Sequence, residues 1–465
     1  MNAKHFLRLG VPLGEPTRRA TDFISKFILS GGDKTRLEEE VKAILANPSA
    51  FTEDKLRSDF AKSLLNAPPP PRAEPVKYRQ WGQGLEHDAV MQMEKACLLP
   101  IAVAGALMPD AHVGYGLPIG GVFATENTVI PYAVGVDIAC RMKMTVLDLP
   151  VTALDDEQER LSRALQRETC FGTGGTFRAR RQHDVLDADW QVSPVTARMR
   201  DRAWSQLGTS GSGNHFVEFG RLTVTNAAAG LPPGDYLALL SHSGSRGTGA
   251  TVADHYSKLA KTLHPELPKE LAQLAWLDLS TEEGQEYWAA MELMGRYAAA
   301  NHALIHQYMA RALGVEVMLD IENHHNFAWR ERHTLPDGSE ADVIVHRKGA
   351  TPAGAGVLGI IPGSMGTPGY IVRGRGSAAS LNSAAHGAGR RMSRTKAKAT
   401  FTWEDAQAFL RARRVTLLSA GLDEVPMAYK DIDAVMAAQA DLVEALARFE
   451  PRLVKMAPGH EKPED

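Results

Sequence analysis

The pattern of hydrophobic and polar positions divides the chain into a helical beginning and a longer region of short apolar runs. Apolar residues recur at helical spacing in 17–29 and 35–47, so residues 1–66 are predicted to form a helical N-terminal extension. The proline run Ala67–Pro71 interrupts this pattern, and proline-rich segments act as stiff spacers. We therefore expect a linker at residues 67–75 and a second region after it.

The second region, residues 76–458, is predicted to be one large catalytic domain. Four apolar runs separated by glycine-rich turns indicate buried strands: 129–136, 236–242, 315–321 and 356–363. Longer stretches with helical periodicity lie between them, at 155–168, 285–314 and 403–414. This mixture predicts an α+β fold with mixed β-sheets and surrounding helices, followed by a polar tail at 459–465.

Composition narrows the class of protein. Hydrophobic residues make up 44% of the 465 positions and charged residues 23%, as in ordinary globular proteins. Only three cysteines are present, which favours a reducing compartment, and we expect a cytoplasmic protein without a secretory signal or a membrane span. The net charge of −3 gives no general nucleic-acid signal, so an anionic substrate would need local basic patches.

The spacing of Asp137 and Cys140 is the clearest chemical signal. A lone cysteine is usually a small buried hydrophobe, and this is the reading for Cys97. A carboxylate three residues from a thiol is different, because burying it without a partner is costly. A metal ion supplies that partner and deprotonates the thiol, and a thiolate can bridge two ions.

Four histidines in polar or glycine-rich loops complete a candidate ligand set. They are His215, His242, His325 and His386. A thiolate, a carboxylate and several imidazoles can build a site for two divalent ions, which points to phosphoryl chemistry.

Two further histidine pairs are judged by their spacing. His324 and His325 follow a predicted strand, where only one of two neighbours can face inward. His302 and His306 lie four residues apart on a helix, a spacing that can chelate zinc. No glutamate stands beside His302 as in the HExxH motif, so ordinary packing is the expected role of this pair.

The loop at His386 allows two interpretations. A neutral imidazole is a competent nucleophile toward phosphorus, and the basic residues Arg390, Arg391 and Arg394 follow it. The same loop could instead grip a phosphate without covalent chemistry. Residues 362–366 and 346–350 are additional candidate anion-binding loops.

Taken together, the motifs resemble the RtcB family of RNA ligases. The similarity covers residues 100–395 and rests on several motifs in order rather than on one. The matching stretches are MPDAHVGYGLPIGG, IPYAVGVDIAC, GSGNHFVE, SHSGSRG, HHN, HRKGAT, PGSMG and HGAGR.

The resemblance implies a reaction and a metal site. Family members use GTP and Mn²⁺ to join an RNA 2′,3′-cyclic phosphate or 3′-phosphate to a 5′-hydroxyl. It implies that Cys140 bridges two ions, one completed by Asp137 and His325 and the other by His215 and His242. His386 would be the catalytic residue that carries GMP, and the substrates would be tRNA halves or broken RNA, with an activating protein as a potential partner.

The resemblance also implies two sets of contacts. The guanylate would be contacted by Asn214, His215, Phe216, Val217, Glu218, His325, Asn326, Pro362, Gly363, Ser364, Met365, Gly369, His386, Gly387, Ala388, Gly389 and Lys455. The RNA backbone would meet Arg178, Arg180, Arg181, Arg390, Arg391, Arg394, Lys396 and Lys398.

The chain departs from the family pattern at several positions. Ala139 and Arg141 flank the metal cysteine where the family usually has glycine, and a bulky Arg141 is expected to alter access to the metals. Gly369 stands where a serine hydroxyl can meet the nucleotide, and Lys455 is followed by an extended end. The alternatives to ligation are a guanylyltransferase that caps ends without sealing, a metal-dependent phosphodiesterase, and a non-catalytic RNA- or GTP-binding protein.

Overall fold

A computed structural model describes residues 1–12, 14–65, 67, 72–225, 230–335 and 337–459. Helices and mixed β-sheets both contribute, which confirms the predicted α+β class. No helix in these described ranges is long and apolar enough to cross a membrane.

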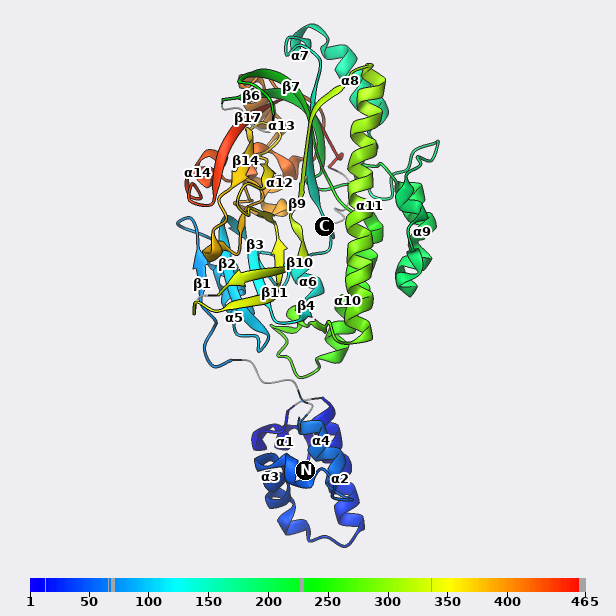
Figure 1. The fold of residues 1–465 in the computed structure, drawn as a ribbon, viewed down its shortest axis with the longest axis vertical. Coiled ribbons are helices and arrows are strands. Elements are labelled where there is room, and N and C mark those ends of the chain that lie inside the picture. The colour runs from blue at the N-terminus through cyan, green and yellow to red at the C-terminus, as the bar shows by residue number, and fades with distance from the viewer. Residues whose placement is uncertain (13, 66, 68–71, 226–229, 336, 460–465) are drawn as a thin grey trace.

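The N-terminal helices form a unit with its own apolar core (Figure 1). They are α1 (Ala3–Leu9), α2 (Glu15–Leu29), α3 (Leu37–Ala46) and α4 (Ser58–Leu65). Phe6, Phe23 and Phe60 are almost fully buried within it. Helices α2 and α3 confirm the two predicted helical patterns. The division into extension, linker, catalytic domain and tail stays a prediction, because Pro68–Pro71 and residues 460–465 lie outside the described residues.

A five-stranded sheet forms one half of the main body. Its order is β1-β2-β3-β11-β10, with β1 parallel to β2 and the other pairs antiparallel. The strands are β1 (Tyr78–Gln80), β2 (Ala102–His112), β3 (Ile119–Thr125), β11 (Glu340–Lys348) and β10 (Asn326–Thr334). Helix α5 (His87–Cys97) packs on β2, which is buried along nearly its whole length.

A larger sheet forms the other half, in the order β13-β14-β17-β6-β7-β5-β9, with β16 paired to β17. Its strands are β13 (Leu358–Ile361), β14 (Gly369–Gly374), β17 (Val443–Met456), β6 (Phe216–Val224), β7 (Gly234–Ser243), β5 (Arg141–Leu147), β9 (Val317–His324) and β16 (Thr416–Ser419). The two edge strands approach each other, and Ile360 N donates to Asn323 Oδ1 at 2.8 Å. Two small pairs, β4 (Thr128–Val129) with β8 (Leu277–Asp278) and β12 (Ala350–Pro352) with β15 (Ser383–Ala385), complete the strands.

Helices cover these sheets, and α11 (Glu282–Leu313) runs along β5 and β7 (Figure 1). The others are α6 (Pro131–Val134), α7 (Ala153–Asp156), α8 (Gln158–Glu168), α9 (Pro194–Gln206), α10 (Arg246–Leu263), α12 (Arg394–Thr400), α13 (Trp403–Ala412) and α14 (Ile432–Ala437). The three helical stretches predicted in this region are confirmed by α7 with α8, by α11 and by α13.

Three of the four predicted strands are confirmed as β7, β9 and β13, but the strand predicted at 129–136 is wrong. Only Val129 belongs to a strand, and α6 begins at Pro131. Proline suits the first helical position because its fixed φ matches the helix and its missing N–H is not needed there. Gly135, with φ +106°, then turns the chain toward Asp137.

Ala139 lies in the left-handed region, with φ +58°, between α6 and β5. Its N–H donates to Asn326 O at 2.7 Å, which fixes the turn that precedes Cys140. A side chain in this conformation costs about 1 kcal/mol, whereas glycine adopts it freely. This cost is a physical reason for the glycine that the resemblance implies at this position.

We therefore expect Ala139→Gly to stabilise the protein by about 1 kcal/mol. The measurement is the urea midpoint, with an unchanged slope. The control is Ala133→Gly in α6, where the buried alanine is helical and the same change should lower the midpoint. A lower midpoint for Ala139→Gly would show that the lost methyl contacts outweigh the relieved strain.

Candidate metal and phosphoryl-transfer site

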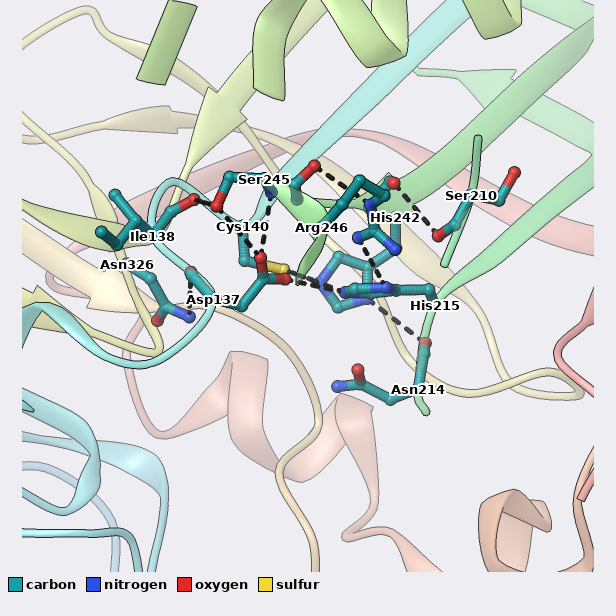
Figure 2. Close-up of polar contacts among 12 residues, drawn as sticks. Asp137, Ile138, Cys140, Ser210, Asn214, His215, His242, Ser245, Arg246 and Asn326 are labelled. Carbon is teal, nitrogen blue, oxygen red and sulfur yellow. Dashed lines mark hydrogen bonds and ion pairs between the residues drawn. The ribbon is translucent and has the colours of Figure 1, made fainter. Parts of the chain in front are cut away.

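Adjacent strand ends bring the five predicted metal ligands together. Figure 2 shows four of them, Asp137, Cys140, His215 and His242. Asp137 and Cys140 lie in the turn before β5, His215 directly precedes β6, and His242 lies in β7. His325 follows β9. Because β6, β7, β5 and β9 are consecutive neighbours in the sheet, ligands far apart in sequence converge at one end of it.

The ligand atoms form two groups that share the Cys140 thiol. Cys140 Sγ lies 3.4 Å from His215 Nε2 and 3.0 Å from His242 Nε2. Asp137 Oδ2 lies 3.1 Å from His215 Nε2, and His242 Nε2 lies 3.3 Å from His325 Nε2. The groups are therefore Asp137–Cys140–His215 and Cys140–His242–His325, with each group's ligand atoms within 4.8 Å of one another.

This grouping corrects the pairing expected from sequence. Asp137 was assigned with His325, and His215 with His242. The structure pairs Asp137 with His215 and His242 with His325 instead. The bridging position of Cys140 is unchanged, since its thiol belongs to both groups.

The chemistry of these side chains fits divalent ions. Burial lowers the pKa of His242 and His325 well below the usual range, so both imidazoles are neutral and can offer a lone pair. Burial opposes ionisation of Asp137, but its contact with His215 and the charge of Arg246 keep the pKa of this carboxyl low. His242 Nε2 contacts both Cys140 Sγ and His325 Nε2, but this nitrogen has only one proton or one lone pair for the two partners. A cation among the three atoms would accept a lone pair from each of them.

Neighbouring groups orient the ligands. Ser245 N donates to Asp137 Oδ1 at 3.0 Å. Arg246, buried and at φ +57°, places Nη2 3.0 Å from His215 Nδ1. A Cβ at Gly211 would lie 1.1 Å from this guanidinium, so glycine is required there. Arg246 therefore supports and orients His215.

His386 lies beside the metal ligands, with its ring centroid 5.0 Å from that of His325. Asp110, fully buried in β2, holds it: Oδ2 lies 2.7 Å from His386 Nδ1 and accepts from the backbone N–H groups of His386 and Gly387 at 3.2 and 3.3 Å. A Cβ at Gly389 would lie 2.1 Å from Asp110 O, so the loop can approach this strand only with glycine.

Sequence reasoning missed Asp110. The available signal was a single carboxylate inside the apolar run that forms β2. Such a residue is costly to bury without a partner, and its partner lies 276 positions away in sequence.

A cavity of about 660 Å³ contains the five ligands and His386. Among the other predicted nucleotide contacts, it is lined by Asn214, Phe216, Asn326, Pro362, Ser364, Met365, Gly387, Ala388 and Gly389. The residues that do not line it are Val217, Glu218, Gly363, Gly369 and Lys455. Glu218 is buried nearby in β6, where burial raises its pKa well above the usual range.

Lys455 is directed away from this cavity. Its ammonium lies 3.3 to 3.4 Å from the carbonyl oxygens of Leu165, Gln166 and Thr169, and 5.7 Å from the centre of the Phe171 ring. The structure therefore gives Lys455 a role at the end of α8, whereas the next residue, Met456, lines the cavity.

Arg141 does not obstruct the metal ligands. Its guanidinium donates to Gly295 O at 3.1 Å and to Glu322 Oε1 at 3.0 Å, on the side of α11 and β9. The expectation that Arg141 changes access to the metals is wrong, because these contacts hold its buried guanidinium outside the cavity that contains the ligands.

Among the predicted RNA-binding residues, Arg390 and Arg394 line the cavity, and both are paired with Glu424. Arg181 is buried, donates to Gly208 O and lies 3.7 Å from the Phe177 ring centre, so it serves packing. The remaining residues, which lie outside the cavity and keep their assignment as a prediction, are Arg178, Arg180, Arg391, Lys396 and Lys398.

Of the candidate loop 346–350, Lys348 and Gly349 line the cavity. Burial lowers the pKa of Lys348 to about 7, and its ammonium donates to the carbonyls of Tyr115 and Tyr132. His346 and Arg347 instead form buried structural contacts, to the Ile130 N–H and the Glu331 carboxylate.

The other sequence expectations about histidine and cysteine are confirmed. His302 and His306 both contact Ser241 Oγ, at 2.7 and 2.8 Å, in the layer between α11 and the sheet. His324 stacks on Trp329, outside the ligand groups. Burial raises the pKa of the Cys97 thiol to about 12, as expected for a structural cysteine.

This geometry defines a class of site, in which two candidate metal-binding groups share one thiol beside a carboxylate-anchored histidine. Comparison with known proteins shows the family to which the chain belongs. The profile of the family described as tRNA-splicing ligase RtcB matches residues 92–191 and 183–456. The RNA-splicing ligase RtcB of Escherichia coli (strain K12) is 35% identical over 405 residues, which cover 80% of this chain and 95% of that protein.

Similar relatives occur in distant organisms. The tRNA-splicing ligase RtcB of Nanoarchaeum equitans is 32% identical, over 79% of this chain and 91% of its own length. The RNA-splicing ligase RtcB of Mycobacterium tuberculosis is also 32% identical, over 78% and 99%. The chain therefore belongs to the RtcB family. Membership confirms the expectation of an enzyme of the RNA ligase class.

Proposed function

We propose that this protein is a cytoplasmic GTP- and Mn²⁺-dependent RNA ligase that joins 3′-phosphate or 2′,3′-cyclic phosphate ends to 5′-hydroxyl ends. Its substrates are tRNA halves or broken RNA, and an activating protein can assist it. The observation that carries the proposal is the placement of His386, anchored by Asp110 at 2.7 Å and 5.0 Å from the ring of His325.

The anchor supports a nucleophilic role for His386. When Nδ1–H donates to the Asp110 carboxylate, the lone pair resides on Nε2, as nucleophilic attack requires. In the proposed first step, Nε2 attacks the α-phosphorus of GTP, an N–P bond forms, and pyrophosphate leaves. The Asp110 carboxylate stabilises the positive charge that develops on the ring.

The later steps return His386 to its starting state. An RNA 3′-phosphate oxygen attacks the phosphorus of the bound GMP, and the N–P bond breaks. The 5′-hydroxyl oxygen then attacks the RNA phosphate, and GMP leaves as the strands are joined. A cyclic phosphate must first be opened by water to give the 3′-phosphate.

The five ligands would hold the two ions in the groups described above. Bound divalent ions neutralise and polarise phosphate oxygens in phosphoryl transfer. Asn214, Phe216 and the 386–389 loop are then available to bind and orient the guanylate, since all of them line the same cavity.

The test is incubation with α-labelled GTP followed by the addition of RNA. Transfer of acid-labile, base-stable label to the protein would support a histidine–GMP bond. A sealed RNA product separates a ligase from a guanylyltransferase that only caps ends. Absence of protein-bound label would favour the phosphodiesterase or the binding protein instead.

Metal choice gives a separate prediction. Thiolate and imidazole ligands favour zinc by affinity, but affinity alone does not decide which ion supports the reaction. We expect ligation with manganese, and inhibition when zinc is added to the manganese-loaded enzyme. Titrating each ion in a sealing assay measures this, and ligation that is best with zinc and absent with manganese would contradict it.

A further inference from the structure

The loop between β2 and β3 presents exposed apolar side chains at the cavity. Tyr115 is 67% exposed and Val113 is 42% exposed, and both line the cavity that contains His386. The glycines on either side of Tyr115 leave no room for other side chains. A Cβ at Gly114 would lie 2.8 Å from Leu117 O, and Gly116 has φ +73°.

The backbone of this loop is fixed from three sides. The Gln92 amide from α5 donates to Gly114 O at 2.6 Å and accepts from Gly114 N at 3.0 Å. Glu86 Oε2 accepts from Val113 N at 3.3 Å, and the Lys348 ammonium donates to Tyr115 O. An anchored loop with exposed apolar side chains is a preformed binding surface, because little ordering entropy remains to be lost on binding.

The same contacts connect Tyr115 to the nucleophile. Lys348, which binds the Tyr115 carbonyl, is followed by Gly349. A Cβ at Gly349 would lie 3.1 Å from the His386 ring, so this backbone packs directly on His386. The surface formed by Tyr115 and Val113 thus belongs to the reaction cavity.

We propose that Tyr115, with Val113 beside it, stacks the base of a terminal RNA nucleotide and so positions that strand end for joining. This inference rests on the proposed function and adds a binding surface for the RNA substrate. Aromatic side chains bind unpaired bases through their π-faces, and such stacking tolerates any base. Sequence tolerance suits an enzyme that joins ends of varied sequence.

The test uses short single-stranded RNAs that carry 2-aminopurine, whose fluorescence is quenched by stacking, in the absence of GTP so that no joining occurs. One arm places it as the last base of a 3′-phosphate strand, and the other as the first base of a 5′-hydroxyl strand. We expect the wild-type protein and Tyr115→Phe to quench the fluorescence in at least one arm. The arm that is quenched identifies the strand whose terminal base stacks on Tyr115. Tyr115→Ala should lose the quench and weaken binding about 5- to 100-fold.

Two variants separate stacking from other effects. Tyr115→Leu keeps apolar bulk without a ring and should also lose the quench, whereas Met318→Ala removes an exposed apolar side chain on β9, outside the cavity, and should change nothing. Quenching and affinity unchanged by Tyr115→Ala in both arms, or quenching retained by Tyr115→Leu, would overturn the inference.

Formation of the GMP adduct is measured separately on the same purified proteins and tests the proposed function. Tyr115→Ala should still form the GMP adduct, because His386 and Asp110 are untouched. If the wild-type protein forms no adduct, the histidine–GMP mechanism fails, while the fluorescence arms still decide whether Tyr115 stacks a terminal base.

Discussion

His386→Ala is expected to abolish the protein–GMP adduct and to reduce sealing of 3′-phosphate RNA to below about 10⁻³ of the wild-type rate. The reason is that the variant lacks the imidazole that would form the N–P bond, although the cavity and the five metal ligands remain. Peptide mass mapping of the GTP-treated protein locates the adduct, and a gel assay measures sealing.

A rescue experiment makes this prediction sharper. RNA that already carries a 3′-guanylyl pyrophosphate bypasses the histidine, so His386→Ala should still join it to a 5′-hydroxyl strand. The control is His255→Ala, which removes an exposed histidine of α10 outside the cavity and should keep both activities. An adduct on a lysine, or undiminished sealing by His386→Ala, would refute the mechanism.

Cys140→Ala is expected to remove both metal ions, whereas His242→Ala should weaken only one site. Cys140 Sγ belongs to both ligand groups, while His242 belongs only to the group with His325. We expect manganese bound per chain to fall from about two ions to nearly none in Cys140→Ala, since both ions lose their shared ligand. Metal content of purified protein and sealing activity are the two measurements.

The corrected pairing adds a comparison between single-ligand variants. His325→Ala should resemble His242→Ala in the ion that it loses, and Asp137→Asn should resemble His215→Ala. Cys97→Ala removes a buried thiol outside both groups and should keep both ions. Retention of two ions by Cys140→Ala would exclude the bridging role.

The sequence predicted the candidate ligands because each lies in a distinctive local setting. Asp137 and Cys140 share one turn, and His215 and His242 stand beside glycine-rich loops. The same local information predicted β7 and α11 from their apolar periodicity. It also misread residues 129–136, where proline and glycine convert an apolar run into a short helix and a bend.

The remaining features depend on distant contacts that spacing along the chain does not encode. Which histidine lies beside the Asp137 carboxylate depends on the contact between His215 and the turn before β5, and that contact was not predicted. The role of Asp110 as the partner of His386 is visible only in the folded chain, where β2 lies against the His386 loop. Lys455 fits a family pattern in sequence, yet its strand directs the ammonium toward the end of α8.

The contacts between Asp110 and His386 also have a consequence for the order of the reaction steps. This carboxylate contacts the backbone N–H groups of His386 and Gly387 as well as the ring, so it holds the imidazole at one position in the cavity. In the proposed mechanism, His386 carries GMP at this one position, so GTP and the RNA 3′-phosphate must react there one after the other. Pyrophosphate therefore has to leave before an RNA 3′ end can enter. Formation of the histidine–GMP bond and transfer of GMP to RNA are then two separate half-reactions in the same cavity.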